Sequence, residues 1–146
     1  MLNKDFREFI ELLNSNKVKY LLVGGFAIAL HGHPRYTKDL DIWLELSENN
    51  ASNVMKALED FGFGDLDISK GDFLQAGMVV QLGYPPNRID LLNSPDGVDF
   101  TECYKTKIEV EIDGLKIYVI DLENLKKNKK ASGRLQDLAD LEKLSA

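Results

Sequence analysis

Three aspartates have the residue type and the spacing to bind metal ions. Asp39 and Asp41 are two residues apart in a stretch that alternates with apolar residues, and Asp90 lies between two apolar residues further along the chain. Residues two apart in a strand project from the same face, so we expect Asp39 and Asp41 to stand side by side. Adjacent carboxylates repel each other unless a cation neutralises them, and such hard oxygen ligands suit Mg²⁺ or Mn²⁺.

Asp90 completes this site only if its strand pairs with that of Asp39 and Asp41 in a suitable register. Three such carboxylates can hold two metal ions about 3.5–4 Å apart, one activating an attacking hydroxyl and the other holding phosphates and the leaving group. That is the chemistry of nucleotidyl transfer. The alternative interpretation is that the strand of Asp39 and Asp41 is an ordinary solvated face.

A glycine pair supplies a second feature of such a site. Gly24-Gly25 follows the apolar run Tyr20–Val23 and precedes a short helical pattern over Phe26–His31. Backbone N–H groups at a glycine turn that opens a helix can approach phosphate oxygens closely. The sequence therefore predicts a phosphate cradle at these glycines, and a plain strained turn is the alternative.

The elements that must position these residues follow from apolar periodicity. Period-two alternation and short apolar runs predict strands over Tyr20–Val23, Asp39–Leu46, Met78–Leu82 and Arg88–Leu92. On the second strand, the residues expected to share the face opposite the aspartates are Leu40, Ile42, Leu44 and Leu46. A hairpin is predicted over Lys107–Ile112 and Leu115–Ile120, across an Asp113-Gly114 turn.

Helical spacing predicts the remaining elements. The expected helices are Lys4 to Asn14 with Asn3 as its cap, a helix through Ala51 to Phe61 that ends at Gly62, Leu122 to Ala131, and Arg134 to Leu144. We therefore expect an α/β (α+β) fold with a mixed, twisted sheet and helices mainly on one face. The late hairpin either extends the sheet or stands beside it. A length of 146 residues fits a single domain, residues 1–146.

Composition narrows the classes of function. The net charge of −6 and a pI near 4.9 argue against a general electrostatic grip on nucleic acid. No apolar run approaches the roughly 20 residues of a membrane helix, and the N-terminus has no pattern of a signal or transit peptide, so we expect a cytoplasmic protein with no membrane partner. The single cysteine, Cys103, is expected to pack in the core, and His31 and His33 to serve loop or capping roles.

The order of these motifs resembles the DNA polymerase beta-like nucleotidyltransferase superfamily. The residues that carry the resemblance are Val23-Gly24-Gly25 and the short helix after it, Arg35-Tyr36-Thr37-Lys38-Asp39-Leu40-Asp41-Ile42, and Arg88-Ile89-Asp90-Leu91-Leu92. The tail from Asn128 to Leu141 is similar to that of small bacterial nucleotidyltransferases of the AbiEii/AbiGii toxin type. Together the similar stretches span residues from about 18 to 144.

This resemblance implies a nucleotidyltransferase fold and transfer of a nucleoside monophosphate from an NTP to an acceptor hydroxyl, with release of pyrophosphate. It implies two Mg²⁺ or Mn²⁺ ions at Asp39, Asp41 and Asp90, with Asp90 acting as the base or positioning it. The implied nucleotide-binding residues are Gly24, Gly25, Arg35, Thr37, Lys129 and Arg134.

Three of these assignments have structural alternatives. Lys129 belongs to a run, Lys126 to Lys130, that is also typical of a solvated charged face, and Arg134 has Asp137 within pairing distance on a helix. Thr37 either reaches a phosphate or closes its loop. We expect Asp137 and Asp140 to orient basic residues and not to bind metal.

The sequence does not identify the acceptor, which could be tRNA, a protein or a small molecule. It also leaves the choice of NTP open. A toxin-type modifier with a cognate antitoxin-like partner is a narrower version of the same hypothesis. The sequence also leaves open whether the chain forms a homodimer. The alternative of a different class is a catalytically inactive module of the same fold that binds a nucleotide or a partner.

Overall fold

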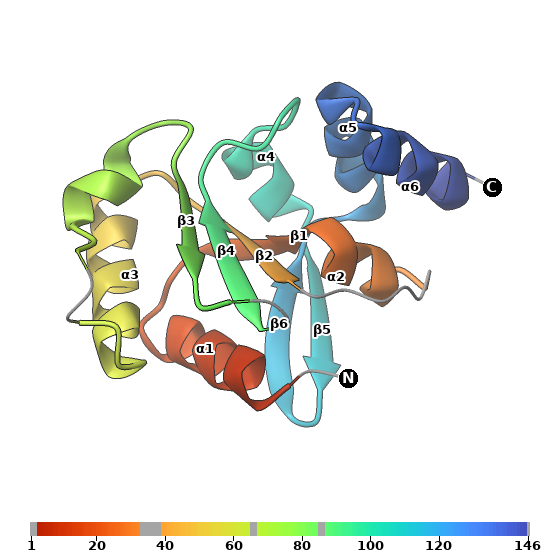
Figure 1. Ribbon diagram of the computed structural model, residues 1–146. Coiled ribbons are helices and arrows are strands. Elements are labelled where there is room, and N and C mark those ends of the chain that lie inside the picture. The colour runs from red at the N-terminus through yellow and green to blue at the C-terminus, as the bar shows by residue number, and fades with distance from the viewer. Residues whose placement is uncertain (1–2, 33–38, 65–66, 85–86, 146) are drawn as a thin grey trace.

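The computed structural model describes residues 3–32, 39–64, 67–84 and 87–145, and these form one mixed sheet flanked by helices (Figure 1). The strand order is β3-β4-β2-β1-β6-β5. The strands are β1 Tyr20–Val23, β2 Asp39–Leu44, β3 Val79–Leu82, β4 Arg88–Leu92, β5 Ile108–Ile112 and β6 Leu115–Val119. β2 pairs parallel with β4 and β1 pairs parallel with β6, whereas the other neighbours are antiparallel. The predicted mixed α/β architecture is confirmed.

The helices of the described residues are α1 Lys4–Ser15, α2 Gly24–Leu30, α3 Glu48–Asp60, α4 Phe100–Lys105, α5 Leu122–Ser132 and α6 Leu135–Ser145, with a short 3₁₀ helix η1 at Lys70–Leu74. Asn3 caps α1 as predicted, because its side chain accepts a hydrogen bond from the Phe6 N–H at 2.8 Å. The glycine pair forms the first turn of α2 and does not precede it. Sequence reasoning missed α4 and η1, which are too short to display a helical period.

The core forms on both faces of the central strands. β1 is buried along its whole length, and Leu40, Ile42 and Leu44 of β2 are buried on the face opposite the aspartates. The prediction for Leu46 was wrong, since β2 ends at Leu44 and Leu46 is 41% exposed. Just beyond β2, the buried Asn50 side chain bonds the backbone of Lys19 and of Glu45.

The late hairpin extends the sheet, with Leu22 of β1 opposite Val119 of β6. On the aspartate side of β2, Trp43 packs edge-to-face on Phe100 of α4 with ring centroids 5.2 Å apart. Helices α5 and α6 pack against each other (Figure 1). Within the described ranges, no helix combines the length and apolarity needed to cross a membrane.

Candidate active site

The pairing of β2 with β4 brings the three aspartates together. The two strands run parallel with Asp41 opposite Asp90 and Asp39 opposite Arg88. Because side chains alternate along a strand, Asp39, Asp41 and Asp90 all project from the same face of the sheet. All three line one cavity of about 520 Å³. The structure thus places the predicted carboxylates side by side, through a strand pairing that no local pattern reveals.

Arg88 lies among these carboxylates and was not singled out from the sequence. Its Nε donates to Asp90 Oδ1 at 2.8 Å, and its Nη2 donates to Asp90 Oδ2 at 3.0 Å and to Asp39 Oδ2 at 2.8 Å. The guanidinium therefore forms a two-pronged pair with Asp90 and a bridge to the neighbouring strand. The sequence did indicate this position, because Arg88 is two residues before Asp90 in a predicted strand and must therefore share its face.

The carboxylates nevertheless outnumber the cation that contacts them. Burial first, and then the charges of Asp90 and Asp39, raise the pKa of Asp41 to about 7. Asp39 Oδ1 is buried and has no hydrogen-bond partner among the described residues. A buried carboxylate oxygen without a partner is costly. The cluster thus retains an excess of negative charge after Arg88 is counted.

Gly24 leaves the room that Asp41 needs. Its φ of +68° lies in the left-handed region, and a Cβ built on it would overlap Asp41 Oδ2 and lie 3.0 Å from Asp41 Cγ. Gly24 lines the cavity, whereas Gly25 is not among its lining residues. The structure therefore explains the first glycine by the position of a carboxylate. Phosphate binding at either glycine stays a prediction.

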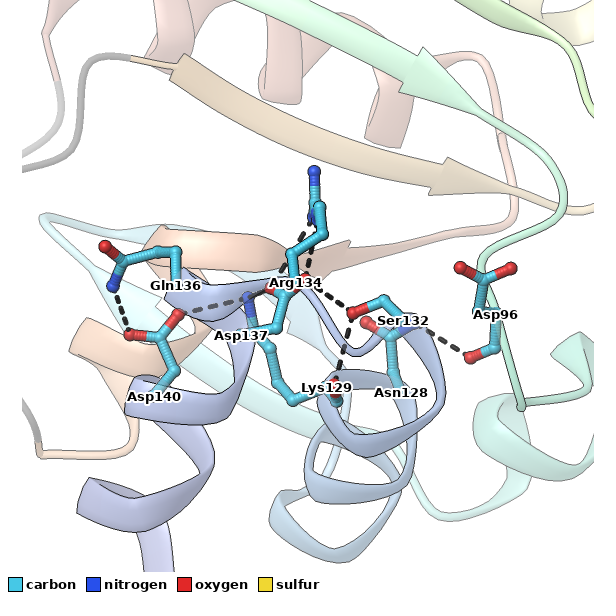
Figure 2. A network of polar contacts seen from close by, with 8 residues as sticks. All are labelled: Asp96, Asn128, Lys129, Ser132, Arg134, Gln136, Asp137 and Asp140. Atoms are coloured by element: carbon cyan, nitrogen blue, oxygen red, sulfur yellow. Dashed lines mark hydrogen bonds and ion pairs between the residues drawn. The ribbon is translucent and has the colours of Figure 1, made fainter.

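A basic wall faces the carboxylates across the cavity, formed by Lys129 of α5 and Arg134 of the turn before α6. Figure 2 shows Lys129 extending between two aspartates of α6, with its Nζ 3.0 Å from Asp137 Oδ1 and 3.3 Å from Asp140 Oδ2. The Lys129 side chain is only 8% exposed, and those of both aspartates are still more buried. Lys129 therefore lines the cavity and does not belong to a solvated face, whereas Lys127 and Lys130 are exposed. Its role in nucleotide binding stays a prediction.

Asp137 gathers several donors at once. Arg134 Nε donates to Asp137 Oδ2 at 2.6 Å, and Ser132 Oγ donates to the same atom. Burial acts to raise the pKa of Asp137, but the hydrogen bonds from Arg134, Ser132 and Lys129 outweigh it and lower this pKa to about 2. Arg134 thus makes the alternative pairing that its sequence allowed and also lines the cavity. Asp137 and Asp140 contact basic side chains, as expected.

The basic wall is fixed against the loop that follows β4. Asn128 Nδ2 donates to the Asp96 carbonyl at 2.9 Å (Figure 2), and a Cβ on Gly97 would overlap the Cβ of Ala131. The close approach of backbone at Gly97 holds α5 next to β4. Since β4 also carries Asp90, the two charged sides of the cavity are joined through one short loop.

Several other predicted residues can now be placed. Arg35, Thr37 and His33 lie outside the described residues. His31 follows α2, and its ring Nε2 lies 2.8 Å from the Ile120 carbonyl oxygen, which is the ordinary role expected of it. Cys103 is 1% exposed, and burial raises the pKa of its thiol to about 11, in agreement with a packing role.

Some observations oppose the binding of a divalent cation by the carboxylates, and others favour it. Across the described ranges no group of three or more His, Cys, Asp and Glu side chains forms a ready-made metal site, and Arg88 takes oxygens of two of the aspartates. The partnerless Asp39 Oδ1 and the raised pKa of Asp41 nevertheless show that the cluster lacks positive charge. The all-oxygen donor set is of the kind that Mg²⁺ or Mn²⁺ prefers.

Solved structures with the same fold include three nucleotidyltransferase-like proteins. A candidate nucleotidyltransferase from Thermotoga maritima has a TM-score of 0.63 and 21% identity, covering 94% of this chain and 88% of that one. Lincosamide antibiotic adenylyltransferase LnuA, bound to lincomycin, has a TM-score of 0.63 and 18% identity, covering 100% and 98%. An antigenic nucleotidyltransferase-like protein from Paracoccidioides brasiliensis has a TM-score of 0.57 and 19% identity, covering 98% and 77%. At these identities the likeness concerns the fold alone.

Sequence comparison identifies the family. No curated protein matches the chain. The family model described as nucleotidyltransferase of unknown function (DUF6036) matches residues 2–145. The finer resemblance to the AbiEii/AbiGii toxin group stays a prediction. Because the match spans nearly the whole sequence, the chain belongs to the DUF6036 family of nucleotidyltransferases.

Proposed function

We propose that the chain is a metal-dependent nucleotidyltransferase that moves a nucleoside monophosphate from an NTP to an acceptor hydroxyl. The observation that carries this proposal is the meeting of opposite charges in one cavity, where Asp39, Asp41 and Asp90 face Lys129 and Arg134. A volume of about 520 Å³ is within the range of pockets that hold small ligands. The family match and the shared fold with an adenylyltransferase support the same reaction.

The cavity residues divide the work of such a transfer. Asp39, Asp41 and Asp90 are the residues that would hold divalent cations, and bound cations would supply charge neutralisation at the phosphates and a lowered pKa for the attacking hydroxyl. Lys129 and Arg134 direct positive charge toward the same space, where they would bind the phosphates that leave as pyrophosphate. Lys129 is pre-organised for this, because Asp137 and Asp140 fix its ammonium group.

The proposed reaction forms one bond at phosphorus and breaks one. The acceptor oxygen forms a bond to the α-phosphorus of the NTP, the bond from that phosphorus to the oxygen bridging to the β-phosphate breaks, and pyrophosphate departs. The hydroxyl proton passes to a carboxylate oxygen, for which Asp90 is our candidate. We propose a small-molecule acceptor, because the cavity is small and the net charge of −6 opposes a long polynucleotide.

The test is transfer of label from α-labelled NTPs in the presence of Mg²⁺ or Mn²⁺, with small hydroxyl compounds, proteins and tRNA as acceptors. We expect the Asp39→Asn, Asp41→Asn double variant to lose about 10²-fold or more of the activity. A double variant matched in charge, Asp67→Asn with Asp113→Asn, changes two exposed aspartates away from the cavity and should retain it.

Activity that survives loss of Asp39 and Asp41 would contradict the proposal. If no acceptor is modified, titration calorimetry with each NTP tests the alternative that the chain is an inactive module. Nucleotide binding that ignores both the metal and the carboxylates is the result expected of such a module.

A further inference from the structure

Arg88 occupies an unusual place for a basic residue in a carboxylate site. It is the first residue of β4, opposite Asp39 on β2 and on the same strand face as Asp90. Its side chain is 27% exposed, so it lies in the wall of the cavity and not in bulk water. The strand register, and not a flexible loop, therefore holds this guanidinium among the three aspartates.

The contacts of Arg88 use the oxygens that a cation would need. Both oxygens of Asp90 accept from Arg88, at 2.8 and 3.0 Å, and Asp39 Oδ2 accepts at 2.8 Å. The hydrogen bond to Asp90, and then the negative charges of Asp90 and Asp39, raise the already high pKa of Arg88 further. The side chain therefore cannot relieve a conflict by losing its proton. A divalent ion at these oxygens and a guanidinium in contact with them would repel each other.

The match between Arg88 and the aspartates is incomplete. One positive charge contacts Asp39 and Asp90, while Asp39 Oδ1 keeps no hydrogen-bond partner within the described residues. A single guanidinium offsets only one unit of the negative charge on these two carboxylates, whereas a divalent ion would offset both. The arrangement is therefore suited to exchange of one cation for another.

We propose that Arg88 is an internal counter-ion that competes with divalent cations for Asp39 and Asp90, and so sets the cation affinity of the site. This inference rests on the proposed function, because it concerns the same carboxylates. Cation binding then requires the Arg88 side chain to leave Asp39 and Asp90.

The experiment measures Mn²⁺ binding to the full chain without nucleotide, from the electron paramagnetic resonance signal of free Mn²⁺. We expect Arg88→Met to bind Mn²⁺ about tenfold more tightly than the native chain, and Arg88→Lys to fall between them, since lysine keeps the charge but loses the two-pronged pairing. Lys130→Met removes one positive charge from an exposed position of α5 and should change the affinity by less than about twofold. Equal or weaker binding by Arg88→Met would overturn the inference.

A second measurement avoids any folding defect of the Arg88 variants. In the native chain, the Nε–H resonance of Arg88 should move or broaden when Mg²⁺ is added, because its bond to Asp90 Oδ1 is lost. An unmoved resonance at saturating Mg²⁺ would overturn the competition. The Asp39→Asn, Asp41→Asn double variant supplies the baseline for binding that does not involve the site.

The outcomes separate this inference from the proposed function. Carboxylate-dependent Mn²⁺ binding that is insensitive to Arg88 overturns the competition and leaves nucleotidyl transfer in place. Tighter binding of Mn²⁺ by Arg88→Met supports the competition, and it overturns the transfer if the native chain also transfers no nucleotide and binds NTPs without regard to metal or carboxylates. Failure of both the native chain and Arg88→Met to bind Mn²⁺ overturns both.

Discussion

Two charged clusters face the same cavity, and their charges are balanced differently. On the sheet side, one arginine contacts Asp39 and Asp90, and the pKa of Asp41 is raised to about 7. A buried oxygen of Asp39 lacks a hydrogen-bond partner within the described ranges. On the helix side, Lys129 and Arg134 meet Asp137 and Asp140, and the pKa of Asp137 is lowered to about 2. One cluster is short of positive charge and the other has its charges matched.

The difference indicates a division of roles. Unmatched buried charge costs stability, and proteins retain it mainly where a ligand or a reaction requires it. A matched buried network instead fixes side chains in place before any ligand arrives. In our proposal, the sheet side is therefore the part that would bind cations, and the helix side is a rigid support for Lys129.

The largest expected effect comes from breaking the matched cluster. Lys129→Met leaves Asp137 and Asp140 buried without their shared cation, and we expect it to lower the free energy of unfolding by about 3–5 kcal/mol in urea titrations. Lys130→Met, at the next and exposed position, should change it by less than about 0.5 kcal/mol. Equal effects of the two variants would show that the network does not stabilise the fold.

Asp41→Asn should have the opposite sign in the cation-free protein. The folded state raises the pKa of Asp41 to about 7, whereas an unfolded chain has an aspartate pKa of about 4. Stability linked to this proton is complete below about pH 4 and is lost as the pH rises from about 4 to about 7. Relative to the native chain, Asp41→Asn should therefore be more stable by up to about 4 kcal/mol at pH 8, with the difference vanishing toward pH 4.

Urea unfolding in the presence of a chelator, at several pH values, measures this difference for Asp41. Asp113→Asn, in the exposed hairpin turn, controls for the removal of one negative charge. A native chain that matches or exceeds the stability of Asp41→Asn at pH 8 would mean that the carboxylate cluster is as well balanced as the basic one.

The smallest expected effect concerns the space that Gly24 leaves for the Asp41 side chain. Gly24→Ala and Gly32→Ala both place a side chain at positive φ, +68° and +89°, which costs about 1 kcal/mol in each case. The new Cβ meets Asp41 at Gly24, whereas at Gly32 no atom of the described residues lies within 4 Å of a Cβ. We expect an excess loss of about 1 kcal/mol for Gly24→Ala, measured by thermal unfolding. No excess would show that the Asp41 side chain rotates away freely.

Local sequence patterns predicted most of the fold but only some of the contacts within the two charged clusters. Alternation along Asp39–Leu44 correctly placed the aspartates opposite Leu40 and Ile42, since a strand has a fixed period of two. The parallel pairing with β4 could not be predicted, because α3, η1 and β3 lie between the two strands in sequence. Arg88 could have been recognised from its two-residue offset to Asp90.

The basic residues show a different limit of sequence reasoning. Lys127, Lys129 and Lys130 look alike in sequence, and only the packing of α5 on α6 shows that one of them is buried. The spacing of Asp137 and Asp140 on one side of α6 was the available signal. A run of lysines therefore identified the region, and tertiary structure was needed to identify the residue.

The register of β2 and β4 also determines which changes in chain length this family can accept. Among the described residues of the connection over residues 45–87, only Val79 lines the cavity. Insertions or deletions there would leave the three carboxylates aligned as long as both strands persist. A single-residue deletion within β4 would instead turn Asp90 toward the core and an apolar neighbour toward the cavity. Relatives of this chain should therefore vary freely in the length of that connection and hardly at all between Arg88 and Leu92.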